Sequence, residues 1–345
     1  MKFSVLCAGM AEPHAGWAAI DELAELLVHY FDAELLSPKP WPSGWGSRWL
    51  ERIRPRYQPV DTAGGDVLMV VCRGPADLAL ISAVPGCRRR FQRIHAWVTD
   101  SYFQAGFGRD AALYDGISVT AVEDAAFPHD RFGIPVVQIY QGADCLKWAP
   151  RHMHVRDIDL IGYGRTPPGY QTCFARRFHS AASPYLYLHS PVGHVTGNSV
   201  HLERGMLFKL LQRTRISLAF HLYVEPQGQR PRSMMVTSRW LESLLAGCIV
   251  AGRRPVSRMA DEMLFWPGAT LELAEEPEQA ADQVQSWLQH DDDWQAQRRC
   301  NIHHMLLHHD WRWRLMQMCQ QFGWPVPQAL HDDIAGIREL AKQFA

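Results

Sequence analysis

Residues 237–251, TSRWLESLLAGCIVA, place a short helix, a glycine and an apolar strand in succession. The leucines recur at the spacing of one helical face, which predicts a helix over residues 239–246. Gly247 follows and suits the left-handed residue that ends many helices. The apolar run 248–251 then predicts a buried strand. A helix that leads directly into a buried strand is typical of an α/β fold.

The same alternation of strand and helix continues on both sides of this stretch. Short apolar strands separated by helical segments of roughly 10–15 residues predict βαβ units and parallel sheets. The sequence therefore predicts two Rossmann-like domains, residues 1–150 and 151–320, facing one another across a ligand cleft, and a helical tail over residues 321–345. Strands are expected at residues 2–8, 33–36, 66–72, 93–98, 115–120, 136–140, 158–161, 185–189 and 216–221, and helices at 20–31, 76–83, 170–179 and 200–212.

Charge and cysteine content exclude several classes of protein. The 35 Lys and Arg residues against 36 Asp and Glu give a net charge of −1, whereas nucleic-acid-binding domains are usually basic, so no nucleic-acid partner is expected. The 8 cysteines are scattered without a C-x-x-C pair, which favours a reducing compartment. Neither a signal-peptide core nor an apolar run of about 18 residues occurs. We therefore expect a cytoplasmic protein and leave peripheral membrane association open.

A first candidate site is the stretch 158–165, IDLIGYGR, in which a strand runs into a Gly-x-Gly turn. Such a turn can bring the backbone at Gly164 close to a phosphate. The third glycine of the dinucleotide fingerprint is absent, because Pro167 takes its place, which argues against NAD. Arg165 at the strand end is suited to clamp a diphosphate. The alternative is an ordinary solvated arginine in a loop.

A second candidate site is the start of the helix over residues 239–246. Ser238 and Glu242 lie on one helical face, and Arg239 precedes Glu242 by three residues. A carboxylate beside a helix N-terminus can hold a ribose diol while the helix end attracts phosphate. The alternative is an ordinary Arg–Glu pair on the surface.

These segments resemble the second domain of group 1 glycosyltransferases, which have two Rossmann-like domains (the GT-B fold). The resemblance rests on TSRWLESLLAGCIVAGRRP and EMLFWPGATLELAEEPEQAADQVQSWL, and is greatest for the family-4-like, CgeB-like branch. VVQIYQGADCLKWAP is similar to the interdomain segment of that family, and IDLIGYGR to the strand that opens its second domain. WRWRLMQM lies where these proteins carry a helix that returns to the first domain.

The resemblance implies that Glu242 binds the ribose of a nucleotide sugar and that Arg165 binds its diphosphate. Met234 stands where the family has the first of two paired glutamates, and the usual Lys after Arg165 is absent, with Gln171 nearby. The missing positive charge is available from Arg230, Arg232, Arg239 or Lys209, and the sequence does not choose among them. The predicted donor-site residues are Gly164, Arg165, Arg232, Ser238, Arg239 and Glu242.

Two residues of the first half are candidate catalytic groups. Asp100 follows the predicted strand 93–98, on the side expected to face the cleft, and suits a base or an anchor for the acceptor. Its alternative role is to cap the next helix. His14 follows the first strand between Gly9 and Gly16, and its alternative is a solvated loop histidine.

No metal site is expected. His304 and His308 are one helical turn apart, a spacing compatible with zinc, but apolar neighbours favour a packed helix. Asp157 and Asp159 form an Asp-x-Asp at the start of a strand rather than after one, so a metal-independent enzyme is expected.

The resemblance thus implies a glycosyltransferase of the hexosyltransferase kind that retains the anomeric configuration. The nucleotide sugar would be a substrate, and no cofactor is expected. The acceptor would be a glycan, a lipid-linked molecule or a protein. The alternatives are a non-catalytic nucleotide- or glycan-binding protein on the same fold, and a sugar-nucleotide epimerase or phosphorylase.

Overall fold

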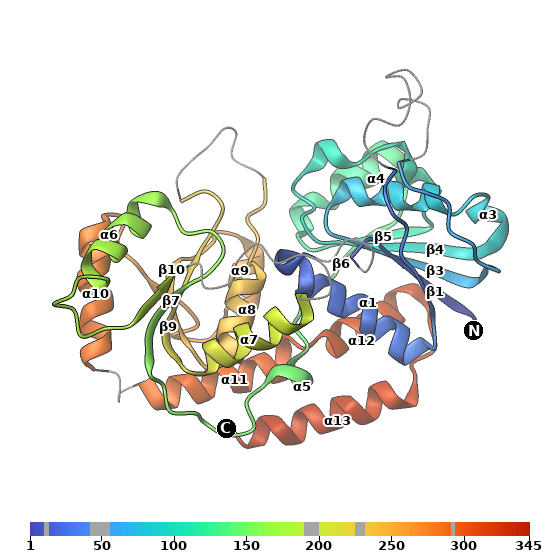
Figure 1. The fold of residues 1–345 in the computed structure, drawn as a ribbon. Coiled ribbons are helices and arrows are strands. Elements are labelled where there is room, and N and C mark those ends of the chain that lie inside the picture. Colours follow the sequence, from blue (N-terminus) through green and yellow to red (C-terminus); the bar gives the residue numbers. More distant parts are fainter. Residues whose placement is uncertain (10–13, 42–55, 190–199, 225–231, 291–293) are drawn as a thin grey trace. The chain divides into compact units, whose positions relative to one another are not determined.

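The computed structural model describes residues 1–9, 14–41, 56–189, 200–224, 232–290 and 294–345. Within these ranges the chain forms two compact units, each with its own parallel sheet (Figure 1). The first unit contains residues 1–141 and 314–330, and the second contains residues 142–313 and 331–345, as far as these are described. The predicted α/β class with two Rossmann-like sheets is confirmed.

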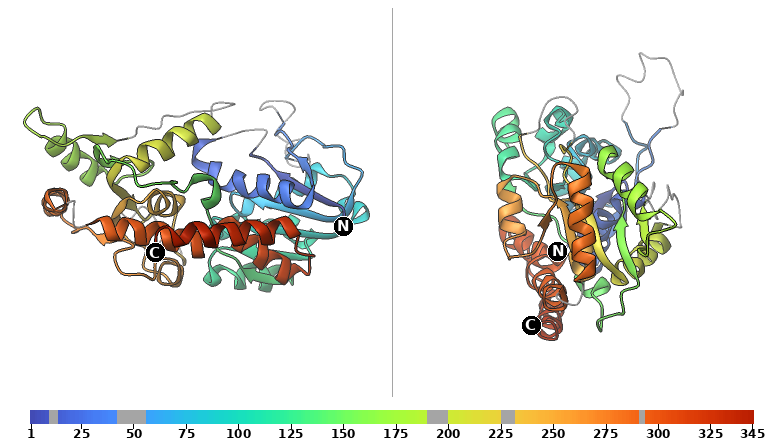
Figure 2. Two further views of the ribbon diagram at one scale, coloured as in Figure 1. Left: turned by 90° about the horizontal axis from the view of Figure 1, so that it is seen from below. Right: turned by 90° about the vertical axis from the view of Figure 1, so that its left-hand side faces the viewer.

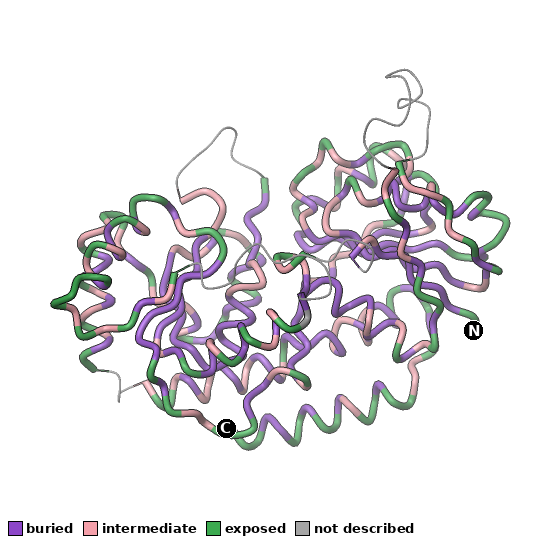
Figure 3. Tube along the Cα trace, in the orientation of Figure 1, coloured by how far each residue is buried: buried purple, intermediate pink, exposed green. Residues whose placement is uncertain are grey.

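The sheet of the first unit has six parallel strands in the order β2-β1-β3-β4-β5-β6. Parallel strands need helical or loop crossovers, which cover both faces, so the central strands are largely apolar. In β3, every residue from Val67 to Cys72 is buried (Figure 3). The strands are β1 (Phe3–Cys7), β2 (Glu34–Leu36), β3 (Gly65–Cys72), β4 (Phe91–Val98), β5 (Gly116–Val119) and β6 (Val136–Gln138).

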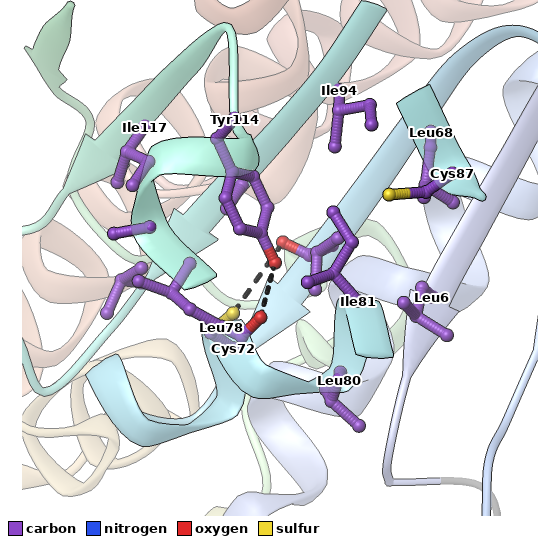
Figure 4. Close-up of a cluster of buried hydrophobic side chains, with 14 of the residues drawn as sticks. Leu6, Leu68, Cys72, Leu78, Leu80, Ile81, Cys87, Ile94, Tyr114 and Ile117 are labelled. Atoms are coloured by element: carbon purple, nitrogen blue, oxygen red, sulfur yellow. Dashed lines mark hydrogen bonds between the residues drawn. The ribbon is translucent and has the colours of Figure 1, made fainter. Parts of the chain in front are cut away.

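Helices and 3-10 turns connect these strands. One face carries a core in which Tyr114 donates its hydroxyl to the carbonyl of Leu78 at 2.8 Å, among side chains of β3, β4 and β5 (Figure 4). The connecting elements are η1 (Ala15–Trp17), α1 (Ala18–Phe31), η2 (Pro75–Ala83), α3 (Cys87–Arg90), η3 (Gln104–Gly106), η4 (Arg109–Leu113), η5 (Val122–Asp124) and α4 (Ala126–Phe132).

Residues 314–330 also belong to the first unit, although the second unit precedes them in the sequence. They include most of α12 (Trp311–Phe322), and the ring of Phe322 stacks on His95 of β4 at 4.2 Å. The ring of Trp324 packs edge-on against Phe3 of β1 at 4.9 Å. This is the return to the first domain that the resemblance implies.

The second unit has five parallel strands in the order β11-β10-β9-β7-β8. One core lies under α6 and α10, and a second lies on the opposite face under α7 and α8. The strands are β7 (Ile158–Gly162), β8 (Tyr187–His189), β9 (Thr214–Phe220), β10 (Ile249–Arg253) and β11 (Leu271–Glu272). The helices are α5 (Cys145–Trp148), α6 (Pro168–Phe178), α7 (Val200–Gln212), α8 (Ser238–Leu245), α9 (Arg258–Met263), α10 (Pro277–Gln289), α11 (Gln295–His308) and α13 (Gln328–Lys342).

Most predicted elements are present, with a few differences. The expected helix over residues 76–83 is the 3-10 helix η2, and the short elements α3, α4, α5, α9 and β11 were not predicted. The helical C-terminal tail is present as α13 (red in Figure 2). Among the helices of the described ranges, none is long and apolar enough to cross a membrane.

Numbered within each unit, the strand order is 2-1-3-4-5-6 in the first sheet and 2-1-3-4-5 in the second, so the two sheets share the order of their first five strands. In such sheets the second strand is added on one side of the first strand, and the third strand is added on its other side. Ligands bind at this topological switch point, beyond the carboxyl ends of the first and third strands. The corresponding places are the carboxyl ends of β1 and β3 in the first unit, and of β7 and β9 in the second.

Candidate functional site

Arg239 spans the carboxyl ends of β7 and β9, where the second sheet is expected to bind ligands. Its guanidinium donates to the carbonyl of Arg165, three residues after β7, and to the carbonyl of Phe220, the last residue of β9, at 3.2 Å. The side chain therefore joins the ends of two neighbouring strands by two hydrogen bonds. Two of the predicted donor-site residues, Arg165 and Arg239, are thus brought together.

Gly164 makes room for this arginine. Its φ of +70° lies in the left-handed region, which favours glycine. A Cβ at this position would also lie 3.2 Å from Cδ of Arg239. The Gly-x-Gly turn after β7 therefore admits an arginine side chain.

The two arginines concentrate positive charge at this edge of the sheet. The pKa of Arg239 is lowered to about 10, mainly by burial; Tyr163 and Glu242 oppose this shift, and repulsion from Arg165 adds to it. Arg239 is therefore still cationic at neutral pH. Arg165 is exposed at the surface. An anion held between two guanidinium groups would remove their mutual repulsion.

The first turn of α8 lies at the same place. Thr237, the N-cap residue, is extended, and its side chain does not cap the helix. Its buried hydroxyl has no hydrogen-bond partner among the residues that the structure describes. Ser238, the first helical residue, is partly exposed. Helix N-termini carry partial positive charge, which adds to that of Arg239.

Glu242 lies one turn further along α8 and is buried, with 5% of its surface exposed. One carboxylate oxygen accepts a hydrogen bond from Nη1 of Arg204 at 2.6 Å, and the other accepts from the hydroxyl of Tyr163 at 3.0 Å. The ion-pair partner of Glu242 is therefore the buried Arg204 of α7, and the alternative of a surface Arg–Glu pair does not describe it. The predicted ribose contact of Glu242 stays a prediction, and it requires the carboxylate to exchange one of these partners.

Tyr163, which follows β7, connects the end of that strand to α8 by hydrogen bonds. Its hydroxyl lies 3.2 Å from the carbonyl of Arg239 and 3.2 Å from the hydroxyl of Ser243, which in turn lies 2.8 Å from the hydroxyl of Ser217 in β9. Burial raises the pKa of Tyr163, so the phenol keeps its proton and donates to Glu242. This chain of hydrogen bonds positions β7, β9 and α8 relative to one another.

Arg204 and Tyr163 were not predicted from the sequence. A signal for Arg204 was present, because it occupies the apolar stripe of α7 at four residues after Val200 and four before Phe208. A charged residue within such a stripe is usually buried with a partner.

The remaining donor-site candidates lie as follows. Arg232 is exposed in the loop before α8, and Arg230 lies outside the described residues. Lys209 lies in the last turn of α7, toward the amino ends of the strands. Of the four basic residues considered for the missing charge, Arg239 is the one that the structure places at the ends of β7 and β9. Met234 is buried, and its carbonyl accepts from the hydroxyl of Ser257.

Asp100 and His14 both follow strands of the first sheet at its carboxyl edge. Asp100 comes two residues after β4, and its backbone N–H donates to the carbonyl of Arg73. It does not cap the following helix, because Phe103 is the N-cap residue of η3. His14 is exposed and caps η1, with Nδ1 accepting from the backbone N–H of Gly16 at 3.1 Å. Their catalytic roles stay predictions.

The carboxyl ends of β1 and β3 hold a further buried ion pair. Nη2 of Arg73 lies 3.3 Å from the carboxylate of Asp21, in the first turn of α1. Burial raises the pKa of Asp21, and Arg73 lowers it. Gly9 is required here, since a Cβ would lie 1.9 Å from the Asp21 carboxylate. Burial raises the pKa of Cys7 to about 12, so this thiol is not a nucleophile at neutral pH.

His303 and His304 of α11 are partly buried against neighbouring groups, whereas His308 is exposed. The ring of His304 stacks on Trp266 at 4.7 Å and on His308 at 5.6 Å, and burial lowers its pKa to about 4. Nδ1 of His303 lies 2.9 Å from the carbonyl of Ala341. Within the described ranges, no group of three His, Cys, Asp or Glu residues is arranged to hold a metal ion.

A cavity of about 450 Å³ lies elsewhere, in the first unit. Its lining includes Gln92 and Gly116, at the amino ends of β4 and β5, together with His95 and with Phe322 of α12. It is at the opposite edge of the sheet from Asp100 and His14. Since ligands of such sheets bind at the carboxyl edge, the cavity is separate from the candidate donor and acceptor sites.

Residues 169–320 match the protein family described as glycosyl transferase-like. No curated protein matches the sequence. The chain is similar to the solved structure of Anabaena Alr3699/HepE in complex with UDP-glucose, with a TM-score of 0.55, 11% identity, and coverage of 94% of this chain and 100% of that one.

Two further structures have lower scores. AviGT4, a glycosyltransferase involved in avilamycin A biosynthesis, has a TM-score of 0.49 and 14% identity, covering 97% of this chain and 98% of its own. A glycosyltransferase from Rickettsia africae ESF-5 has a TM-score of 0.48 and 10% identity, covering 99% of both chains.

The family match begins in α6 and ends in α12, so it includes α8 with Arg239 and Glu242. The likeness to HepE extends over both units and shows the fold. Membership of the CgeB-like branch stays a prediction. The chain therefore has a GT-B fold, and its residues 169–320 form a glycosyl transferase-like domain.

Proposed function

We propose that the protein is a glycosyltransferase that moves a sugar from a nucleotide sugar to an acceptor. The observation that carries this proposal is Arg239, whose guanidinium spans the ends of β7 and β9 within the segment that matches the glycosyl transferase-like family. The diphosphate of the donor lies against Arg239, Arg165 and the first turn of α8. UDP-sugars are the first donors to test, because HepE was solved with UDP-glucose.

The chemistry of this site is the stabilisation of a leaving nucleoside diphosphate. Negative charge develops on that group as the glycosidic bond breaks, and fixed guanidinium groups and helix N–H groups stabilise it most when they are already in place. The hydrogen bonds of Arg239 to two strand ends hold its guanidinium in position before the donor binds. The reaction proceeds without a metal ion and with retention at the anomeric carbon.

The acceptor is a glycan, a lipid-linked molecule or a protein, and it binds the first unit. Asp100 and His14 are the proposed catalytic groups, because both stand at the carboxyl edge of the first sheet. Asp100 acts as base or as an anchor for the acceptor hydroxyl. The donated group is a hexosyl residue.

The test is a panel of UDP-sugars and other nucleotide sugars, read by thermal shift and by release of the nucleoside diphosphate. A ligand at about 100 times its Kd stabilises the native state by about 2.7 kcal/mol. Arg165→Ala removes a charge-assisted hydrogen bond, so we expect donor affinity to fall roughly tenfold to a hundredfold. Arg239→Lys keeps the charge but loses the planar fork, and we expect a similar loss.

Arg213→Ala is the matched control, because Arg213 is an exposed arginine at the other edge of the same sheet, paired with Asp157. It should leave donor binding unchanged. If no nucleotide sugar shifts the melting temperature of the wild type, the proposal is wrong. Turnover that persists in EDTA supports the metal-independent mechanism, and loss of turnover in EDTA contradicts it.

A second candidate function is a nucleotide- or glycan-binding protein without turnover. It is favoured by Met234, which is buried where the resembled family has a glutamate. Binding of a nucleotide sugar without release of the diphosphate, over a panel of glycan and lipid-linked acceptors, would favour this candidate over the transferase.

A further inference from the structure

Three apolar side chains of the second unit, Val155, Leu202 and Met206, are exposed. Leu202 is 77% exposed and Met206 is 41% exposed, and both lie on the outward stripe of α7, four residues apart. Val155, in the loop before β7, is 87% exposed. Isolated exposed aliphatic residues are common, but a group of them on one surface often marks an interface.

Cationic side chains continue the same surface. Lys209 follows Leu202 by seven residues, so it lies on the same stripe of α7, and it is exposed. Arg151 is exposed in the loop that carries Val155. Lys209 is close enough to His154 to help lower the pKa of that imidazole, together with desolvation and His152. The loop and the end of α7 therefore share one positively charged area.

The loop is held against α7 by packing and hydrogen bonds. The ring of Trp148 in α5 stacks on Phe208 of α7 at 4.6 Å with an interplanar angle of 3°, and α5 and α7 are both drawn in Figure 1. The amide of Gln212 donates to the carbonyl of Trp148 at 3.1 Å. Nη1 of Arg156 donates to the carbonyl of Leu211 at 3.3 Å. Residues 151–156 and α7 are therefore parts of one folded surface.

We propose that this surface, formed by Arg151, Val155, Leu202, Met206 and Lys209 and here termed the α7 surface, docks onto an anionic membrane. Cations attract anionic headgroups, and aliphatic side chains beside them enter the boundary between headgroups and acyl chains. The exposed aliphatic residues favour a lipid over an acidic polymer, because an acidic polymer offers them no apolar environment. Asp157, the nearest acid in the loop, is neutralised by Arg213. This role is separate from sugar transfer.

The test is co-sedimentation of the full chain with vesicles of equal parts phosphatidylcholine and phosphatidylserine, against vesicles of phosphatidylcholine alone. We expect binding to the anionic vesicles, weakened by salt. Each Lys or Arg near an anionic surface contributes roughly a fivefold increase in partitioning, so the double variant Arg151→Gln, Lys209→Gln should bind about 25-fold less tightly. The double variant Val155→Ser, Leu202→Ser should lose about tenfold.

The matched control is Val256→Ser, Arg258→Gln, which removes an aliphatic residue that is 79% exposed and an exposed arginine elsewhere on the second unit. It should bind vesicles as the wild type does. Equal binding to anionic and neutral vesicles, or full binding by the Arg151→Gln, Lys209→Gln variant, would overturn the proposal. Retention on an acidic polysaccharide that Val155→Ser, Leu202→Ser leaves unchanged, without vesicle binding, would assign the surface to an acidic polymer instead. All substituted side chains are exposed, so unchanged melting temperatures verify that each variant is folded.

Discussion

The buried pair of Arg204 and Glu242 allows a sharp test of the second unit. Arg204→Met removes the guanidinium that lies 2.6 Å from Oε1 of Glu242, and leaves the hydroxyl of Tyr163 as the donor to that carboxylate within the described part of the chain. Both side chains are almost fully buried. Removal of one partner of such a pair leaves an uncompensated charge away from water, so we expect a loss of about 3–5 kcal/mol in the free energy of unfolding.

A second substitution separates the charge from the packing. Glu242→Gln in the Arg204→Met background removes the buried charge while keeping an oxygen that accepts from Tyr163. Replacement of a whole buried pair by neutral groups of similar size is often neutral, so the double variant should lie within about 1 kcal/mol of the wild type. The two substitutions should therefore be strongly non-additive.

The assay is urea-induced unfolding followed by tryptophan fluorescence, with the transition of the second unit fitted separately because two units do not unfold in one step. Arg177→Met is the control, since Arg177 forms exposed pairs with Glu278 and Asp282, and it should cost less than about 1 kcal/mol. The reasoning would be refuted if Arg204→Met lowers the free energy of unfolding by no more than this control does. It would also be refuted if adding Glu242→Gln to Arg204→Met restores none of the lost stability.

Two further outcomes are expected. Burial lowers the pKa of His95 from 6.5 to about 4, so between these pH values the unfolded chain binds more protons than the folded chain. The contribution of this neutral imidazole to the free energy of unfolding should therefore be fully present above pH 6.5 and fall by about 3 kcal/mol as the pH drops to 4. Melting curves over this pH range should show that His95→Phe flattens the dependence in the first unit, and an unchanged slope would contradict the buried neutral imidazole. Gly252→Ala should lower the melting temperature by an amount equivalent to about 1–3 kcal/mol, because its Cβ would lie 1.6 Å from the backbone oxygen of Ala219. Gly205 lies within α7, and a Cβ at this position would have no atom within 4 Å outside the backbone of that helix. Gly205→Ala should therefore be neutral or stabilise the protein by up to about 1 kcal/mol. A loss of stability as large as that of Gly252→Ala would contradict this expectation.

The local sequence pattern was sufficient to predict most of the helices and strands. The helix expected at residues 200–212 is α7 with those bounds, and Gly247, expected at a helix end, has a φ of +75°. The helix expected at residues 76–83 is a 3-10 helix instead. Apolar composition does not distinguish the two helical types over so short a stretch, since their hydrogen bonds differ by one residue in span.

The site was predicted less completely than the fold. The sequence singled out Gly164, Arg165, Arg239 and Glu242 as site residues. It did not indicate that Arg239 bonds to the ends of two strands, or that Glu242 pairs with Arg204, which lies 38 residues away. Such partners are set by which strands become neighbours, and this is a long-range property that spacing along the chain does not contain.

The sequence by itself determined that this chain is α/β with parallel sheets, because hydrophobic periodicity and the glycines that end helices or form turns act over a few residues at a time. It also determined the resemblance to glycosyltransferases, through short segments that fold locally. Only the tertiary structure decided which charged groups meet. The ion pairs Arg204–Glu242 and Arg73–Asp21 join helices and strand ends that are distant in sequence, and burial within the folded units determines their partners and shifts the pKa of Asp21.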